Sequence, residues 1–304
     1  MTRGAHERTP RQLPPGVASL GADPCELCLK LRLVASGDVQ YIFGSTPTDL
    51  ETKRLDRLEQ VLDPHTFERL DRLGVPRGSR CLEVGAGRGT SALFLLTRCG
   101  ATGEVVATDI DTRWIDQIRH PNFRAVRHDI LADPVEDLGL FDLIHVRYLL
   151  GNIGAERGQD VVQRLAGRLA PGGRILIEEP QVALAADPSH GYSDAWKRLV
   201  RHWDDFTVRL GLDTNFGVRL PPLLLSVGLD SIGTDIQGSV THGGDTWSDW
   251  ALTSLESAKN AVAQAFDDGG AAIRALIADE SFWKVYWLSA ATWGSQRSHE
   301  HTTS

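Results

Sequence analysis

Glycines at alternate positions mark the stretch CLEVGAGRGT, residues 81–90, in which the glycines directly follow a short apolar run. A glycine-rich turn behind a strand lets a ligand touch the main chain, because any Cβ there would collide with it. The amides that open the following helix then face the ligand. Nucleotide-binding proteins of many kinds share such a turn. Its candidate ligand contacts are Gly85, Ala86, Gly87 and Gly89.

Two aspartates further along the chain indicate what that ligand contains. Asp109 follows the apolar run VVAT, where a carboxylate can accept hydrogen bonds from both hydroxyls of a ribose. Asp129, in RHDIL, can accept a hydrogen bond from the exocyclic amine of an adenine, and the amide of Ile130 can donate one to a ring nitrogen. Ile110 and Trp114 offer apolar walls for the ring. These residues predict a cofactor that carries an adenosine.

The charge beside the glycine turn separates two classes of such cofactor. Glu83 stands two positions before the first glycine. A dinucleotide would bring two negative phosphates to the turn, where a glutamate is unfavourable. S-adenosylmethionine instead brings a zwitterionic amino acid and a positive sulfonium. Glu83 therefore favours S-adenosylmethionine as the cofactor.

Alternating strands and helices must position these residues. Such alternation predicts a mostly parallel sheet covered on both faces, with ligands collecting beyond the carboxyl ends of the strands. The candidate residues and Glu178/Glu179 all fall at those ends. We expect strands over residues 80–84, 104–109, 123–129, 141–147 and 174–179, and helices over 90–97, through Trp114 to Ile118, and over 157–169.

The flanking segments are predicted to be mainly helical. Thr48 to Glu51 has the form of a capping box for one helix, and Asp63-Pro64 indicates the start of a second that stops at Gly74. After Pro180 we expect a helix over 190–212, a sixth strand over 229–240, helices within 246–278 and an aromatic-rich last strand over 281–294. These helical pieces read as insertions that cover the ligand edge of the sheet.

The bulk composition narrows the class of protein and its partners. The 304 residues include 41% hydrophobic residues and carry a net charge of −8, which is ordinary for a globular protein and unsuited to a broad nucleic-acid surface. No apolar run approaches the ~20 residues that span a bilayer. We expect a small-molecule acceptor as the partner, no nucleic acid, no membrane and a cytoplasmic location, and a homodimer remains open. Cys25 and Cys28 form a lone CxxC pair, read as reduced thiols, so no metal site is predicted.

The motifs LEVGAGRG, VVATDID, RHDI, FDLIHVRYLL and LAPGGRILIEEP together resemble the class I S-adenosylmethionine-dependent methyltransferases. The resemblance is strong over residues 41–179 and looser beyond, and it is greatest to bacterial small-molecule enzymes of the ubiquinone and natural-product type. It implies an α/β, Rossmann-like fold with a seven-stranded, mostly parallel sheet whose last strand is antiparallel. The implied division is a leader and helix over 1–40, a cofactor-binding core over 41–180, and a remainder over 181–304 with a helical substrate cap.

The resemblance also adds cofactor contacts. YIFGSTPTDLETKRL resembles the family's approach to the cofactor, in which an aromatic and an arginine help to enclose it. By that match Tyr41 and Arg54 are candidate contacts, although Arg54 could equally be a solvated charge paired with Glu51 or Glu59. Histidine and arginine are frequent in the family at the end of the fourth strand, which makes Arg147 a further candidate.

Methyl transfer is an in-line displacement for which the protein chiefly supplies position and desolvation, so a dedicated base is optional. Histidine can act as a base near neutral pH. The candidates are His145 in the fourth strand, His190 at the start of the covering insertion and His202 on its helix. Each could instead pack or lie at the surface, and for His145 a structural role is favoured. Glu178 or Glu179 could orient an amine acceptor.

Other functions fit the sequence less well. A nicotinamide-dependent oxidoreductase predicts a GxGxxG turn, no acid before it and a second mononucleotide-binding half. A protein that binds S-adenosylmethionine without catalysis would be expected to carry broken motifs, and these are intact. A protein or RNA methyltransferase often carries an Asn-Pro-Pro-Tyr motif, which the sequence lacks. The sequence therefore predicts a methyltransferase that acts on an oxygen, nitrogen or carbon atom of a small molecule.

Overall fold

The computed structural model describes Phe43, residues 46–182 and residues 194–297. The predicted division at residues 40 and 180 remains a prediction. The strands within the described ranges are β1 (Arg80–Val84), β2 (Glu104–Asp109), β3 (Phe123–Arg127), β4 (Phe141–Arg147), β5 (Leu169–Pro180), β6 (Asp230–Thr241) and β7 (Lys284–Ser295).

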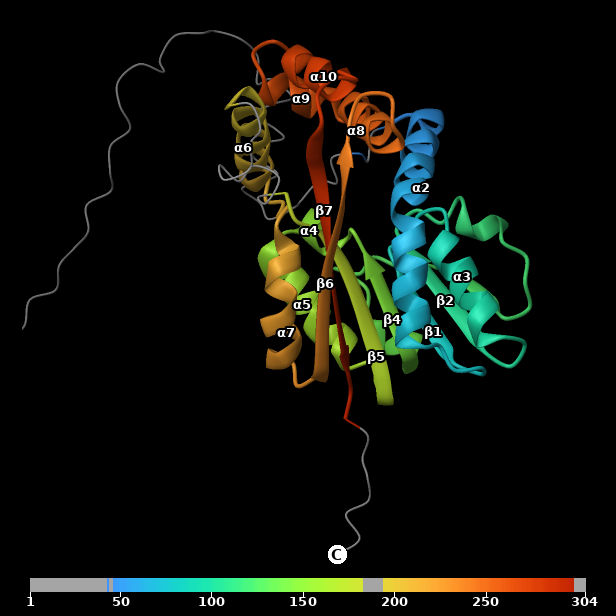
Figure 1. Ribbon diagram of the computed structural model, residues 1–304. Coiled ribbons are helices and arrows are strands. Elements are labelled where there is room, and N and C mark those ends of the chain that lie inside the picture. The colour runs from blue at the N-terminus through green and yellow to red at the C-terminus, as the bar shows by residue number, and fades with distance from the viewer. Residues whose placement is uncertain (1–42, 44–45, 183–193, 298–304) are drawn as a thin grey trace, which may run out of the picture. The chain divides into compact units, whose positions relative to one another are not determined.

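The strands form one seven-stranded sheet in the order β3-β2-β1-β4-β5-β7-β6 (Figure 1). Neighbours from β3 to β5 pair in parallel. Strand β7 pairs antiparallel with β5 on one side and β6 on the other. The expected α/β, Rossmann-like sheet with an antiparallel last strand is confirmed. Several bounds differ. Strand β3 ends at Arg127 rather than Asp129, β5 already begins at Leu169, and β7 begins at Lys284 rather than Ser281.

The helices connect and cover these strands. The α-helices are α2 (Thr48–Leu73), α3 (Thr90–Cys99), α4 (Leu150–Ile153), α5 (Ala155–Ala166), α6 (Asp194–Arg209), α7 (Leu220–Ser226), α8 (Thr246–Ser257), α9 (Lys259–Ala265) and α10 (Ala271–Ala278). Short 3₁₀ turns are η1 (Ile115–Gln117), η2 (Val135–Leu138) and η4 (Phe216–Arg219).

Helix α2 is continuous, where the sequence predicts two helices that meet at Asp63-Pro64. It begins after Pro47 without a side-chain cap, so the predicted capping box is wrong. Pro64 lies inside the helix, where proline costs ~3 kcal/mol because it removes a backbone donor and crowds the preceding turn. The buried side chains of Leu62 and Leu70 on either side of it anchor both halves of the helix. Tertiary packing thus overrides the local stop signal.

The predicted helix through Trp114 is reduced to the single turn η1, and the chain is already extended at Ile118. Local side-chain bonds hold this segment in a tight loop. Thr112 donates its hydroxyl to Asp116, and the Asp111 carboxylate accepts from the Arg113 amide. Short polar side chains that bond to nearby groups compete with helix formation. The result is a compact loop directly after β2.

The two faces of the sheet carry separate apolar cores. Helices α2 and α3 cover one face, with Leu70 and Leu95 in its core. Helices α5 and α7 cover the other, with Val162 and Leu224. Because side chains alternate along a strand, each strand supplies both cores. A parallel sheet sandwiched in this way leaves its carboxyl edge as the place for a ligand.

Helices α6, α8, α9 and α10 form a cap beyond the carboxyl ends of the parallel strands, and the beginning of α2 packs against α8 (Figure 1). The cap has a core of its own that contains Trp196, Phe206 and Trp250. These aromatic rings therefore form the interior of the cap. Within the described ranges, no helix is both long enough and apolar enough to cross a bilayer.

Candidate active site

The glycine turn joins β1 to α3 and has the backbone that only glycine adopts readily. Gly85, Gly87 and Gly89 have φ angles of +70°, +54° and +89°, in the region that disfavours side chains. A Cβ on Gly89 would lie 2.9 Å from Ile118 of the η1 loop. A Cβ on Gly87 would meet nothing within 4 Å. The main chain at Gly87 therefore faces open space that a ligand can enter.

Asp109 ends β2 and ties the glycine turn to the next loop. Its carboxylate accepts hydrogen bonds from the amide of Gly87 at 2.8 Å and from the amide of Asp111 at 2.9 Å. Burial raises the pKa of Asp109, and those two bonds oppose the rise. Each carboxylate oxygen has a second lone pair, so the group can still accept a ligand hydroxyl. The structure thus brings together the predicted Gly87 and Asp109.

The residues predicted to hold adenine are spread over two loops. Ile110 is 54% exposed and lines a hollow of about 500 Å³ with Arg127 and the η1 loop. Trp114 stacks under the Arg113 guanidinium, which lies 5.1 Å from its ring.

The loop after β3 contributes the other adenine candidates. Asp129 is exposed, and its carboxylate accepts from the amide of Leu131 at 2.9 Å. Ile130 is buried, and its carbonyl accepts from Arg164. A ligand must therefore compete with a local bond at Asp129, while Ile110 is freely accessible.

Glu83 differs from its predicted role beside the glycine turn. It is buried on β1, and its carboxylate lies 2.7 Å from Nδ1 of His145. The register of the parallel strands places the two residues opposite one another. The other ring nitrogen of His145 lies 3.1 Å from the carboxylate of Glu178 on β5. Glu83 is thus engaged inside the sheet and is unavailable to neutralise a ligand ammonium.

His145 is fully buried between these two carboxylates. Burial opposes its charge, but Glu83 and Glu178 outweigh burial and raise the pKa of His145 to about 9. At neutral pH both ring nitrogens therefore carry protons and both are engaged. A general base needs a free nitrogen near its substrate. The predicted base role of His145 is wrong, and its role is to link three strands.

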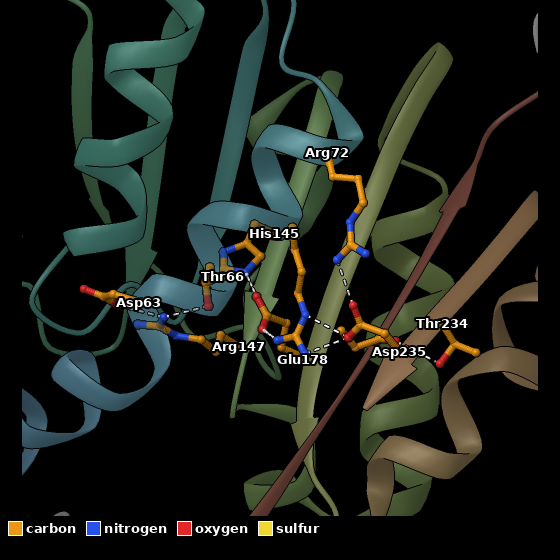
Figure 2. A network of polar contacts seen from close by, with 10 residues as sticks. Asp63, Thr66, Arg72, His145, Arg147, Glu178, Thr234 and Asp235 are labelled. Carbon is orange, nitrogen blue, oxygen red and sulfur yellow. Dashed lines mark hydrogen bonds and ion pairs between the residues drawn. The ribbon is translucent and has the colours of Figure 1, made fainter. Parts of the chain in front are cut away.

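The network extends across the sheet to α2 and β6, as Figure 2 shows. Glu178 forms a buried ion pair with Arg69, which also binds Asp235 of β6 at 2.7 Å. Burial would raise the pKa of Glu178, but His145 and Arg69 lower it to about 2. We call the five residues Glu83, His145, Glu178, Arg69 and Asp235 the His145 network. The sequence analysis missed Arg69 and Asp235, although Arg69 falls on the apolar face of its helix.

A second set of charges joins α2 to the glycine turn. The Arg147 guanidinium donates to Asp63 at 2.8 Å and to Thr66 at 2.9 Å (Figure 2). Arg88, within the glycine turn, lies 3.2 Å from the carboxylate of Glu59. Burial raises the pKa of Glu59 to about 7, although Arg88 opposes the rise. Glu59 and Asp63 are acids near the turn that the sequence analysis did not assign to the site.

The remaining candidates lie elsewhere. Arg54 is buried, forms a two-pronged ion pair with Glu51, and stacks 4.1 Å from the centre of the Phe43 ring. The predicted pairing with Glu51 is therefore present, but in a buried form. His202 bonds to the carbonyl of Ala265 at the end of α9. Tyr41 and His190 lie outside the described residues.

The residues around the turn fit S-adenosylmethionine. The space in front of Gly87 is open, since a Cβ there would meet nothing within 4 Å, so a ligand can reach the main chain of the turn. Asp109 supplies lone pairs at the strand end, and the exposed Ile110 supplies an apolar surface beside it. The nearby carboxylates of Glu59 and Asp63 suit the ammonium group of S-adenosylmethionine better than a pyrophosphate.

Comparison with known proteins agrees with this chemistry. A family model described as a methyltransferase domain matches residues 57–212, about half of the chain. The ubiquinone/menaquinone biosynthesis C-methyltransferases UbiE of Azotobacter vinelandii and Pseudomonas fluorescens are 32% and 30% identical over 137 and 138 residues. These matches cover 41% and 42% of this chain and 53% of each relative. The chain thus spans about half the length of the curated relatives it matches.

A solved structure supports the fold. The cyclopropane synthase MmaA2 from Mycobacterium tuberculosis superimposes with a TM-score of 0.50 at 15% identity, and the match covers 75% of this chain and 81% of that one. Likeness at this level extends to the fold alone.

Proposed function

Because this chain belongs to the methyltransferase domain family and its cofactor is S-adenosylmethionine, we propose that it transfers a methyl group to a small-molecule acceptor. One observation carries the proposal. The main chain at Gly87 is open to a ligand and is held in place by Asp109, at the carboxyl edge of a parallel sheet. That edge is where ligands bind in sheets of this kind.

We place the cofactor with its amino acid against the glycine turn and its ribose at Asp109. Ile110 then faces the adenine. Since Glu83 is engaged by His145, the acids nearest the ammonium group are Glu59 and Asp63 of α2. The assignment of adenine contacts to Trp114, Asp129 and Ile130, and of cofactor contacts to Arg54, Arg147 and Tyr41, remains a prediction.

The bound cofactor supplies an activated methyl group on a positively charged sulfur. The chain's own residues would hold the turn rigid through Asp109, exclude water beneath the cap, and keep the buried charges neutralised in pairs. Holding two reactants in line can lower a barrier by ~7–11 kcal/mol in favourable cases. His145 has no free nitrogen, so the proposal requires no base on β4. His190 and His202 remain predicted candidates.

The relatives bear on the acceptor. They are named as C-methyltransferases of ubiquinone and menaquinone biosynthesis, which makes a carbon atom of a quinone precursor one acceptor to test. Oxygen and nitrogen acceptors, a role in natural-product biosynthesis and a cytoplasmic location also remain predictions.

Calorimetric titration with S-adenosylmethionine and, separately, with NADH tests the proposal. We expect S-adenosylmethionine alone to bind. Asp109→Ala should weaken that binding by about 10- to 100-fold, because two or more hydrogen bonds to a charged acceptor are lost. Asp137→Ala, which removes an exposed carboxylate of η2 outside the hollow that Ile110 lines, is the matched control. Binding of NADH alone, or unchanged affinity in Asp109→Ala, would contradict the proposal.

A further inference from the structure

Tyr148 combines an unusual backbone with an unsatisfied side chain. It directly follows β4 and has a φ of +52°, whereas bulky residues rarely adopt positive φ. Its amide donates to the carbonyl of Glu178 at 2.8 Å, so the sheet holds this conformation. Backbone strain of this kind concentrates at functional sites.

The Tyr148 hydroxyl belongs to a set of three buried polar atoms without a hydrogen-bond partner among the described residues. The other two are the Ser289 hydroxyl and the Gln237 amide oxygen. Ser289 is only 4% exposed. It lies beside the Tyr148 hydroxyl closely enough to influence the pKa of the tyrosine, but outside hydrogen-bonding geometry. Buried polar atoms in native proteins are nearly always paired, so three together indicate a missing ligand.

Strand pairing places Ser289 and Gln237 in one row, and Tyr148 follows the neighbouring end of β4. Ser289 of β7 lies opposite Gln237 of β6 on one side and Pro180 of β5 on the other. The next strand in the sheet is β4, whose end carries Tyr148. Because alternate residues share a face, Ser289 and Gln237 lie on the same face as Asp235, two residue pairs nearer the cap. The row therefore runs along the carboxyl edge, on the face that α2 covers.

The row is close to the cofactor turn. Leu149, the residue after Tyr148, lies 3.3 Å from the position that a Cβ on Gly85 would take. A ligand held by Tyr148 would thus lie near the place proposed for the amino acid end of the cofactor.

The surrounding charges select the kind of ligand. The nearest guanidinium groups are already paired, Arg147 with Asp63 and Arg69 with Glu178 and Asp235. Among the described residues, these two guanidinium groups therefore offer an anionic ligand no unpaired positive charge. Burial raises the pKa of Tyr148, and Glu178 raises it further, so the phenol stays neutral and can donate. The set contains two hydroxyls, which can donate or accept a hydrogen bond, and one amide oxygen, which can only accept. It therefore matches a ligand group that can both donate and accept a hydrogen bond.

We propose that Tyr148, Ser289 and Gln237, the Tyr148 set, form the polar end of the acceptor site and bind a neutral hydroxyl group of the methyl acceptor. The inference rests on the proposed methyl transfer. The acceptor hydroxyl donates to the Gln237 amide oxygen and accepts from Tyr148 or Ser289. This row positions the acceptor and selects hydroxyl compounds over their ethers and over carboxylates.

A pair of matched probes tests this selection in the full-length protein saturated with S-adenosylhomocysteine. 4-Fluorophenol carries the hydroxyl, and 4-fluoroanisole carries a methyl ether in its place. Fluorine NMR titration gives the Kd of each. We expect the wild type to prefer the phenol by about fivefold or more, as one or two net hydrogen bonds allow. Tyr148→Phe and Ser289→Ala should each reduce that preference to about twofold or less.

The control variant is Ser295→Ala, which makes the same chemical change at the far end of β7, opposite Arg174. It should keep the preference of the wild type. Equal affinity for the two probes in the wild type, including failure to bind either, overturns the inference, as does an undiminished preference in both Tyr148→Phe and Ser289→Ala. Titration of the same samples with S-adenosylhomocysteine reports separately on the proposed function, whose failure would appear as lost cofactor binding in the wild type.

Discussion

Two neighbouring regions on one face of the sheet differ in whether their buried polar groups have partners. In the His145 network, each described charge faces an opposite one from another strand or from α2. Towards the cap, the Tyr148 set holds polar atoms that have no partner in the described part of the chain. The charged groups of the His145 network are thus engaged with one another, whereas the polar atoms of the Tyr148 set can still form hydrogen bonds with a ligand.

Whether a buried polar group already has a partner distinguishes structural residues from candidate binding residues more reliably than the type of residue does. Histidine and glutamate are common catalytic residues, yet here their side chains bind one another and link β1, β4 and β5. Tyrosine, serine and a glycine turn are less conspicuous, yet they present open hydrogen-bonding groups or open main chain. A variant in the first region should therefore change stability, and a variant in the second should change binding.

The largest effect is expected for His145→Ala. It leaves the carboxylates of Glu83 and Glu178 buried without the cation between them, and breaking such a pair costs ~3–5 kcal/mol. The free energy of unfolding from urea titration at pH 7 measures this loss. His120→Ala, at an exposed histidine, is the control and should stay within about 0.5 kcal/mol of the wild type. A loss below about 1 kcal/mol in His145→Ala would show that the network is not a structural unit.

The pH dependence of stability sharpens the same test. The pKa of His145 is raised from 6.5 to about 9, so its contribution is complete below pH 6.5 and disappears as the pH rises through 9. The pKa of Glu178 is lowered from 4.5 to about 2, so its contribution is complete above pH 4.5 and disappears as the pH falls through 2. Stability should decline above pH 6.5 in the wild type and decline less in His145→Ala. An identical alkaline decline in both would contradict the assignment.

The next effect concerns binding at the glycine turn. Gly87→Val should weaken S-adenosylhomocysteine binding by about 100-fold or more, because the side chain fills the space before the main chain. Gly228→Val is a matched control, since Gly228 also has a positive φ, +87°, and nothing within 4 Å of its Cβ position. Both variants should lose ~1–2 kcal/mol of stability from the left-handed backbone. Equal cofactor affinity in the two variants would place the cofactor elsewhere.

The sequence predicted the sheet and the open parts of the site because those signals are local. The glycine turn, Asp109 after VVAT and the alternation of strands and helices can each be read within a short window. It failed where the outcome depends on strand register or on packing between distant segments. Glu83 meets His145 only because β1 and β4 align in parallel, and Arg69 meets Asp235 across 166 positions of sequence.

The same limit explains the errors in local structure. Asp63-Pro64 is a strong local signal for a new helix, but the packing of α2 against both sheet and cap keeps the helix continuous. Ser289 and Gln237 come from strands at one end of the sheet, and their position near Tyr148 follows from the order of β4, β5, β7 and β6. The frequency of histidine and arginine at the end of the fourth strand in the family it resembles was the signal that favoured a structural role for His145.

The smallest expected effect lies at Glu59 of α2, which faces Arg88 of the glycine turn. Burial raises its pKa from 4.5 to about 7, so ionisation of Glu59 lowers the stability of the folded protein as the pH rises from 4.5 to 7. Glu59→Gln should therefore gain ~1 kcal/mol over the wild type between those pH values, after loss of the Arg88 ion pair is included. Urea titrations at pH 4.5 and 8 measure the difference, with Glu68→Gln at an exposed carboxylate on α2 as control.

If Glu59 also faces the ammonium group of the cofactor, the affinity for S-adenosylhomocysteine in the wild type should rise from pH 6 to pH 8 as the carboxylate ionises. In Glu59→Gln that rise should be reduced by at least half, because the titrating group is gone, while Glu68→Gln should follow the wild type. A parallel rise in all three proteins would assign the ammonium to Asp63 or to main-chain carbonyls. Glu59 would then join the His145 network as a charge whose effect is on stability alone.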